Sequence, residues 1–283
     1  MTLPELHVHP EVWGLLGAVL AGYFVALRRL GPGAVLPGEP VATRGQRVAF
    51  TAGVLVLLAG ASWPIHDLAE DYLFSVHMVQ HVLFSLVAPP LLLLGTPRWL
   101  ATLLLRPRRV MALAVHLTRP VVALLVFNTV IVATHWPPVV DAVLRSEPLH
   151  LLAHVVLFTT ALCMWVPVLS PAPALLRRLT PPGQMLYLFL QSVVPTVPAS
   201  FLTFADKPIY DFYAEAPRIW DVSATTDQLV AGLLMKIGAG FLLWTIITLI
   251  FFRWYAEEDR RERGVLVWDD VEREFQELER GPR

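Results

Sequence analysis

The sequence predicts an all-α, polytopic membrane protein: a bundle of seven transmembrane helices with its N-terminus outside and its C-terminus in the cytoplasm. Three observations lead to this prediction. The 283-residue chain is 55% hydrophobic and only 16% charged, whereas an ordinary soluble domain carries roughly 25% charged residues. Its apolar residues form runs of about 20, the length that spans a bilayer as a helix. Its lysines and arginines alternate from one side of these runs to the other.

Seven apolar runs are long enough, or nearly long enough, to span a bilayer. They are 11–28, 48–65, 72–95, 120–139, 149–169, 183–204 and 228–252. Several of them contain proline, which frees a backbone carbonyl that only neighbouring helices or polar groups can satisfy in lipid. We therefore expect a packed transmembrane domain over 1–255, followed by a cytoplasmic amphipathic tail over 256–283.

The positive charges orient this arrangement. Loops rich in lysine and arginine stay in the cytoplasm. Of the 22 such residues, all but four lie in one alternate set of connections or in the tail; the exceptions are Arg145, Lys207, Arg218 and Lys236, the last within a span. The alternation holds only for an odd number of spans, so it supports seven.

The segment between the last two runs is rich in aromatic residues. Tyr210, Tyr213 and Trp220 lie within 205–226, on the outer side. Tyrosine and tryptophan are enriched at the surface of membranes. We expect these three side chains to form part of an aromatic belt.

Composition also excludes some functions. The formal net charge is −1, and no isolated basic run marks a nucleic-acid partner. The one cysteine, Cys163, rules out an intrachain disulfide and a thiolate cluster. Neither H-E-x-x-H nor G-x-S-x-G occurs, so we expect no enzyme activity.

The histidines point to a metal site. Eight of the nine lie on or near the outer side, and only His116 lies in a cytoplasmic loop. Two pairs have i, i+4 spacing, which places both rings of a pair on one helix face, and His135 lies at a similar depth. Imidazole is a common ligand of copper, zinc, iron and nickel. The predicted ligands are His77, His81, His135, His150 and His154. The alternative is that these histidines only form hydrogen bonds between helices.

Four further residues are candidates for auxiliary roles. Asp227 could cap the last helix or orient a ligating histidine. Met78 and Met235 could offer thioethers to Cu(I), although methionine more often fills gaps in a core. His66 follows the second run at the outer side. The sequence leaves open whether a second site uses His7, His9 and His66.

An ordered set of motifs carries a family resemblance. It runs through His77-Met-Val-Gln-His81, Pro89-Pro90-Leu91, Gly95-Thr96-Pro97, His135-Trp136-Pro137-Pro138, His150-x-x-x-His154, Trp165-x-Pro167 and Asp227-Gln228-x-x-Ala231-Gly232-x-x-Met235. With these motifs the chain resembles the CtaG family of multi-span assembly factors for caa-type cytochrome c oxidase. The resemblance covers roughly 50–250, which is most of the chain.

The resemblance implies a multi-pass protein of the bacterial inner membrane that helps to mature a haem–copper oxidase by delivering or inserting copper. Its implied partners are an oxidase subunit or a copper chaperone, besides membrane lipid. The positions that match are His77, His81, His135, His150, His154 and Asp227. Zinc or haem could replace copper at such histidines.

Two other functions remain open at this stage. The first is a haem-binding electron carrier, in which one histidine from each pair ligates iron. The second is a scaffold or transporter without metal, in which the histidines couple helices or relay protons. Glycines in the last run, Gly232, Gly238 and Gly240, would permit close packing within the chain or in a homodimer.

Overall fold

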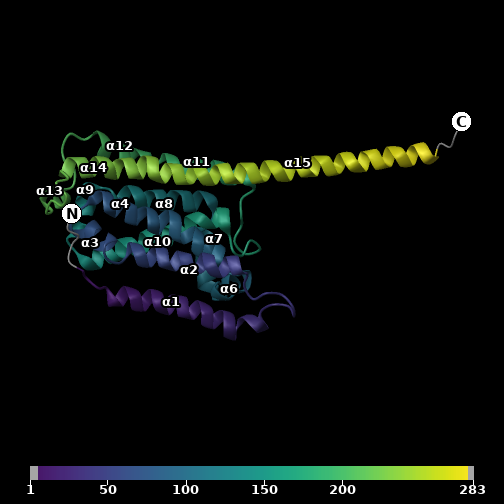
Figure 1. Cartoon of the computed structure of the whole chain (residues 1–283), viewed down its shortest axis with the longest axis horizontal. Coiled ribbons are helices and arrows are strands. Elements are labelled where there is room, and N and C mark those ends of the chain that lie inside the picture. Colours follow the sequence, from purple (N-terminus) through teal and green to yellow (C-terminus); the bar gives the residue numbers. More distant parts are fainter. Residues whose placement is uncertain (1–5, 280–283) are drawn as a thin grey trace.

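The computed structural model describes residues 6–279, and this part of the chain is helical and contains no strand (Figure 1). The all-α prediction is confirmed for these residues. The first half comprises α1 (Pro10–Arg29), η1 (Gly31–Gly33), α2 (Arg44–Gly60), α3 (Ile65–Asp71), α4 (Phe74–Val82), η2 (Leu83–Val87), α5 (Ala88–Gly95), α6 (Arg98–Leu104), α7 (Arg108–Leu117) and α8 (Pro120–Thr134). The second half comprises α9 (Pro137–Leu144), α10 (Glu147–Leu169), α11 (Pro181–Val193), α12 (Thr196–Phe204), α13 (Asp211–Glu215), α14 (Ala224–Leu233), η3 (Leu234–Gly238) and α15 (Ala239–Glu279).

Five helical stretches are long and apolar enough to cross a membrane: Pro10–Arg29, Phe74–Gly95, Glu147–Leu169, Pro181–Phe204 and Ala224–Arg261. Two bent pairs raise the number to as many as seven if each pair forms one span. In one pair α2 and α3 meet at 41°, and in the other α7 and α8 meet at 81°. The chain is therefore a multi-span membrane protein, and its helices match the predicted apolar runs closely.

Three predicted boundaries differ from the structure. The run 48–65 was expected to be one span, but α2 ends at Gly60 and α3 begins at Ile65. The run 120–139 was expected to be a single helix, but α8 ends at Thr134 and α9 begins at Pro137. The residue before a proline disfavours helical geometry, and Trp136 is extended with ψ 124°. The predicted tail does not begin as a separate helix, because α15 continues unbroken to Glu279. Its amphipathic character stays a prediction, and residues 280–283 of that tail lie outside the described part.

A neighbouring helix satisfies one of the carbonyls that the prolines in the spans leave free. Pro89 has no N–H to offer the carbonyl of Ser85, four residues earlier. The indole of Trp165 on α10 donates to that carbonyl instead, at 2.9 Å. The hydroxyl of Tyr187 on α11 also donates to a backbone carbonyl of α10, that of Met164, at 3.0 Å. Side chains of neighbouring helices thus satisfy backbone groups that lipid cannot.

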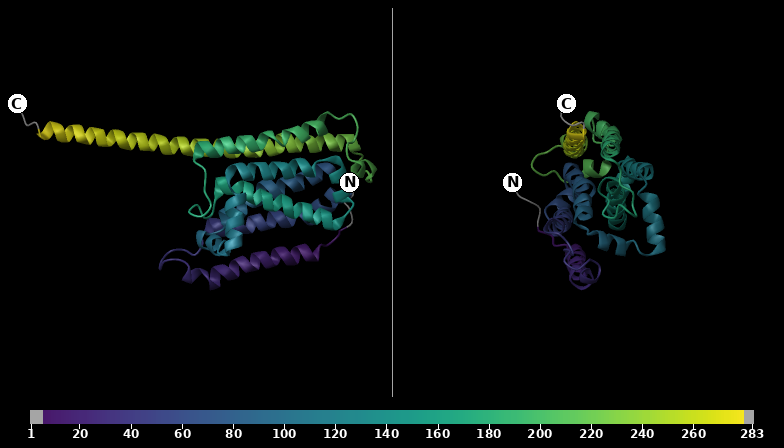
Figure 2. Two further views of the ribbon diagram at one scale, coloured as in Figure 1. Left: turned by 180° about the vertical axis from the view of Figure 1, so that it is seen from behind. Right: turned by 90° about the vertical axis from the view of Figure 1, so that its right-hand side faces the viewer.

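The two ends of the bundle differ. The start of α1 lies at the end that also holds α3, α9 and α13, whereas α15 projects far beyond the opposite end (Figure 1). The end-on view in Figure 2 places α1 at the edge of the bundle. Inside the bundle, α4, η2 and α5 pack between α2, α10 and α14. The histidine pairs of α4 and α10 therefore face the interior from adjacent helices.

Candidate metal centre

The start of α4 is fixed by a carboxylate from a distant helix. Asp227 on α14 is 1% exposed. Its two oxygens accept hydrogen bonds from the backbone N–H groups of Phe74 at 2.7 Å and Ser75 at 3.0 Å. The first turn of a helix has no internal partners for its N–H groups, so Asp227 caps α4. The residue predicted to cap its own helix or orient a histidine instead positions the helix that carries His77.

Five predicted ligands gather at one place. The ring centroids of each i, i+4 pair, His77 with His81 and His150 with His154, lie 4.3 Å apart. Across the helices the distances are 5.6 Å from His77 to His150, 5.7 Å from His81 to His154 and 5.8 Å from His81 to His135. Donor atoms of His77, His81 and His154 all lie within 4.8 Å of one another. Three segments, α4, α10 and the end of α8, thus contribute to one imidazole cluster.

Each imidazole of this cluster has a free nitrogen. Among the described residues, these buried atoms have no hydrogen-bond partner: Nδ1 of His77, Nδ1 of His81, Nε2 of His135, Nε2 of His150 and Nε2 of His154. A buried polar atom without a partner is costly. Five of them in one cluster form a set of donors suited to a metal ion that prefers nitrogen.

Two of the rings are held by contacts on their other nitrogen. Nδ1 of His135 lies 2.6 Å from the Ile131 carbonyl, to which it can only donate. Nδ1 of His150 lies 3.1 Å from Oε1 of Glu70, and this carboxylate favours a proton on that nitrogen. In both rings Nε2 is then left with its lone pair. Contacts of this kind orient metal-ligating histidines and fix their tautomer.

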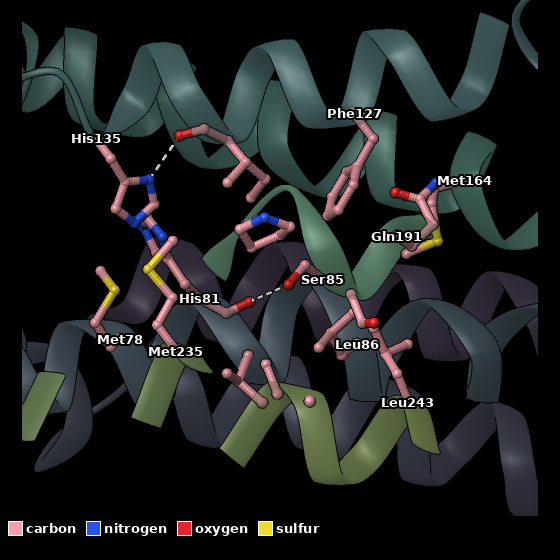
Figure 3. Close-up of a pocket in the computed structure, with 16 residues that line it drawn as sticks. Met78, His81, Ser85, Leu86, Phe127, His135, Met164, Gln191, Met235 and Leu243 are labelled. Atoms are coloured by element: carbon pink, nitrogen blue, oxygen red, sulfur yellow. Dashed lines mark hydrogen bonds between the residues drawn. The ribbon is translucent and has the colours of Figure 1, made fainter. Parts of the chain in front are cut away.

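The predicted methionines lie beside the cluster. Met78 is 2% and Met235 8% exposed. Both line a cavity of about 50 Å³ that also includes His81 and His135. Figure 3 shows these four residues at one end of the cavity, with Phe127 and Leu243 toward the other.

A second space of about 20 Å³ adjoins His77, His150 and His154. Soft thioethers therefore lie next to the imidazoles, and both spaces are small. Met235 lies within a π-helical turn, η3, and a second such turn, η2, begins two residues after His81; π-helical turns are frequent at functional sites.

Two tyrosines from the segment between α12 and α14 cover the cluster. The Tyr210 hydroxyl donates to the His135 carbonyl at 3.0 Å, and the Tyr213 hydroxyl donates to the Ala69 carbonyl at 2.8 Å. Burial raises the pKa of the Tyr213 hydroxyl well above its usual range, so it remains a donor. The prediction of an aromatic belt is wrong for both residues, which are 2% and 4% exposed. Trp220, at 37% exposed, agrees with it.

Sequence reasoning missed two carboxylates. Glu70 contacts both His66, at 2.8 Å, and His150, at 3.1 Å. Asp67 contacts His9 at 3.2 Å. The i, i+4 spacing of His66 and Glu70 was visible in the sequence, but nothing linked it to His150. The predicted auxiliary residue His66 thus lies outside the five-histidine cluster and contacts it through Glu70.

The remaining basic candidates lie elsewhere. His7 and His116 are exposed. The ammonium group of Lys236 lies 3.4 Å from the Ser200 hydroxyl and 5.7 Å from the centre of the Phe204 ring. These contacts place Lys236 against α12, away from the histidines.

Comparison with known proteins adds a family to this geometry. A family model described as cytochrome c oxidase caa3 assembly factor matches residues 21–257. Uncharacterized proteins of Mycobacterium bovis and Mycobacterium tuberculosis are each 28% identical over 274 residues, which covers 88% of this chain and 39% of theirs. The chain thus spans about two fifths of the length of these curated relatives. No solved structure matches the chain.

Proposed function

The chain belongs to the cytochrome c oxidase caa3 assembly factor family, and from this premise we propose that it binds copper in its histidine cluster and delivers it during oxidase assembly. The observation that carries the proposal is the convergence of five buried imidazole nitrogens that have no hydrogen-bond partner among the described residues. Polar groups inside a membrane are expensive and usually functional. A cluster of five requires a ligand or a set of partners.

Copper is the cargo that these donors fit best. Imidazole binds Cu and Zn well, and a methionine thioether is a known weak ligand of copper beside imidazole, so Met78 and Met235 favour copper. Zinc is the alternative, since imidazole suits it equally. Haem is a further alternative, with one histidine from each pair as an axial ligand of iron.

The proposal includes a topology of seven spans in a bacterial cytoplasmic membrane, with the N-terminus outside. Two observations support it. The start of α1 and the exit of α15 lie at opposite ends of the bundle (Figure 1), as an odd number of spans requires. The arginine-rich connection over 96–119 and the later part of α15 would face the cytoplasm. The histidine cluster then opens toward the outer side.

The proposed role is transfer of an ion, without enzyme turnover. The family description names an assembly factor, and the partner we propose is an oxidase subunit or a copper chaperone that approaches from the outer side. An ion bound by neutral imidazoles can exchange them for ligands of such a partner, and no carboxylate has to gain or lose a proton. Delivery therefore needs only a competing set of donors at the entrance.

The experiment is metal analysis and absorption spectroscopy of detergent-purified protein after loading with copper. Wild type is compared with His77→Ala/His154→Ala, and with His77→Leu/His154→Leu, which restores volume without a donor. His116→Ala, on the exposed surface of α7, is the control for loss of a histidine. We expect stoichiometric copper in wild type and control and its loss in both double variants.

Equal copper in all four proteins would overturn the proposal. Absence of copper from wild type would do the same and would favour a scaffold that holds no metal. An intense porphyrin absorption band in freshly purified wild type would instead support the haem carrier. In each comparison thermal melting in detergent checks that the variants are folded.

A further inference from the structure

A second group of histidine and carboxylate side chains covers the outer side of the five-histidine cluster. We name it the outer layer, and its members are His9, His66, Asp67 and Glu70. His9 directly precedes α1, and the other three lie on α3. The rings of His9 and His66 are 4.5 Å apart, edge to face. Nε2 of His9 lies 3.2 Å from Oδ1 of Asp67, and Nδ1 of His66 lies 2.8 Å from Oε1 of Glu70.

Packing holds these parts together. The indole of Trp13, in the first turn of α1, donates to the hydroxyl of Ser62 at 3.0 Å. This bond ties the start of α1 to the segment that leads into α3. The side chain of His9 is 20% exposed, whereas that of Asp67 is 7% exposed. The outer layer thus has a face reachable from outside and a buried interior.

Asp67 is the member that points to a ligand. Its Oδ1 contacts His9, but its Oδ2 is buried and has no hydrogen-bond partner among the described residues. A buried carboxylate oxygen without a partner is strongly unfavourable, and a bound cation would relieve this. His9 and His66 offer imidazole nitrogens beside it.

Glu70 connects the outer layer with the inner cluster. One oxygen of this carboxylate, Oε1, lies 2.8 Å from His66 and 3.1 Å from His150. His150 in turn lies 5.6 Å from His77 between ring centroids. A continuous series of metal-binding side chains therefore runs from the exposed edge of His9 to the five histidines.

We infer that the outer layer is a second metal site, which acquires a divalent copper or zinc ion and passes it to the inner cluster beside His150. The inference rests on the proposed function of that cluster. Mixed carboxylate and imidazole donors suit a divalent ion, and the negative charge of Asp67 and Glu70 attracts it from the outer side. Transfer exchanges ligands on the ion and leaves its charge unchanged.

The outer layer binds more weakly than the inner cluster. Among the described residues, only His77, His81 and His154 bring three donor atoms within 4.8 Å of one another. The donors of the outer layer are more widely spaced and must move to close on an ion. A site that binds the ion first and with lower affinity can release it to the inner cluster.

The first test measures loading kinetics on the full-length protein in detergent, with Cu²⁺ from a weakly buffered salt as the probe. We expect Asp67→Asn, which keeps the shape of the side chain, to load at least tenfold more slowly than wild type and to reach the same final occupancy of the inner cluster. His9→Gln should behave similarly. The control His116→Ala should match wild type.

The second test removes the inner cluster and measures binding of the same ion at equilibrium. We expect His77→Ala/His154→Ala to retain one weak Cu²⁺ site, and addition of Asp67→Asn to abolish it. This arm is independent of the proposed function, because it does not require the inner cluster to bind metal. Loss of the inner copper with the weak site retained would support the outer site, whereas failure of wild type to bind inner copper would overturn only the proposed function.

Two results would overturn the outer site. One is loading of Asp67→Asn within twofold of the wild-type rate. The other is absence of any Cu²⁺ binding in the inner double variant. A fall in the final occupancy of the inner cluster at an unchanged rate would place Asp67 in that cluster and would also contradict the inference.

Discussion

Replacement of Glu70 by glutamine tests how strongly a carboxylate outside the cluster supports the bound ion. Its Oε1 lies 3.1 Å from Nδ1 of His150, and the free Nε2 is on the far side of the same ring. With a metal–nitrogen bond of about 2 Å, the carboxylate would lie roughly 7 Å from an ion bound there. Glu70→Gln keeps the shape and removes the charge.

The magnitude follows from this distance. At an effective dielectric constant of about 20, a unit charge at roughly 7 Å from a divalent ion contributes about 4.7 kcal/mol. Loss of an outer partner of a ligating histidine typically costs about 10- to 100-fold in affinity, which corresponds to about 1.4–2.8 kcal/mol. The Coulomb value is the larger of the two, and we expect copper affinity to fall at least tenfold.

The assay is competition for copper against a chromophoric chelator, with detergent-purified protein. Glu215→Gln is the matched control, because it makes the same chemical change in an ion pair with Arg145 that is exposed near the same end of the bundle. Exposed ion pairs contribute little, so the control should bind copper as wild type does. An affinity of Glu70→Gln within twofold of wild type would refute the reasoning about this carboxylate.

Three further predictions concern the scaffold. Asp227→Asn should lower the free energy of unfolding by about 1–3 kcal/mol and weaken copper binding, because the amide has one accepting oxygen where the carboxylate has two for the N–H groups at the start of α4. Thermal melting and metal analysis measure the two effects, and an unchanged melting temperature would contradict the capping role. Gly95→Ala should destabilise the fold, since its new methyl group would collide with the backbone of Phe50 on α2. Gly14→Ala, where nothing lies within 4 Å, should leave the melting temperature unchanged or raise it, and equal melting of the two glycine variants would contradict this packing. Fusion of a reporter that is active only in the cytoplasm should give signal at the C-terminus and none at the N-terminus; the reverse pattern would refute the proposed orientation.

The parts predictable from sequence were those with a local signal. The i, i+4 spacing of the two histidine pairs predicted that each pair shares a helix face, and the rings of each pair do lie 4.3 Å apart. Apolar runs of about 20 residues predicted the long helices. Depth, taken from the distance of each histidine to the end of its run, was enough to place His135 with the pairs.

The parts that were missed depend on contacts between distant segments. Glu70 meets His150 because α3 bends away from α2 by 41° and brings this one carboxylate into contact with α10. Asp227 meets Phe74 across 153 residues. Tyr210 and Tyr213 turn inward because α13 packs over the cluster, although tyrosine near a membrane surface is usually a sign of the interface. None of these contacts has a periodicity that the sequence could display.

The distribution of charge around the centre suits an ion that is held and then released. The five histidines are donors without negative charge and lie in the apolar part of the bundle. They do not neutralise a bound cation, so a net positive charge there is energetically costly. Of the carboxylates in the outer layer, Glu70 contacts the cluster at His150 and Asp67 contacts His9. Several carboxylates as direct ligands would hold the ion far more tightly, because buried opposite charges attract strongly at low dielectric constant. The carboxylates of the outer layer attract the ion, and the uncharged histidines of the cluster bind it without neutralising it. A partner with stronger ligands can therefore remove the ion from the cluster.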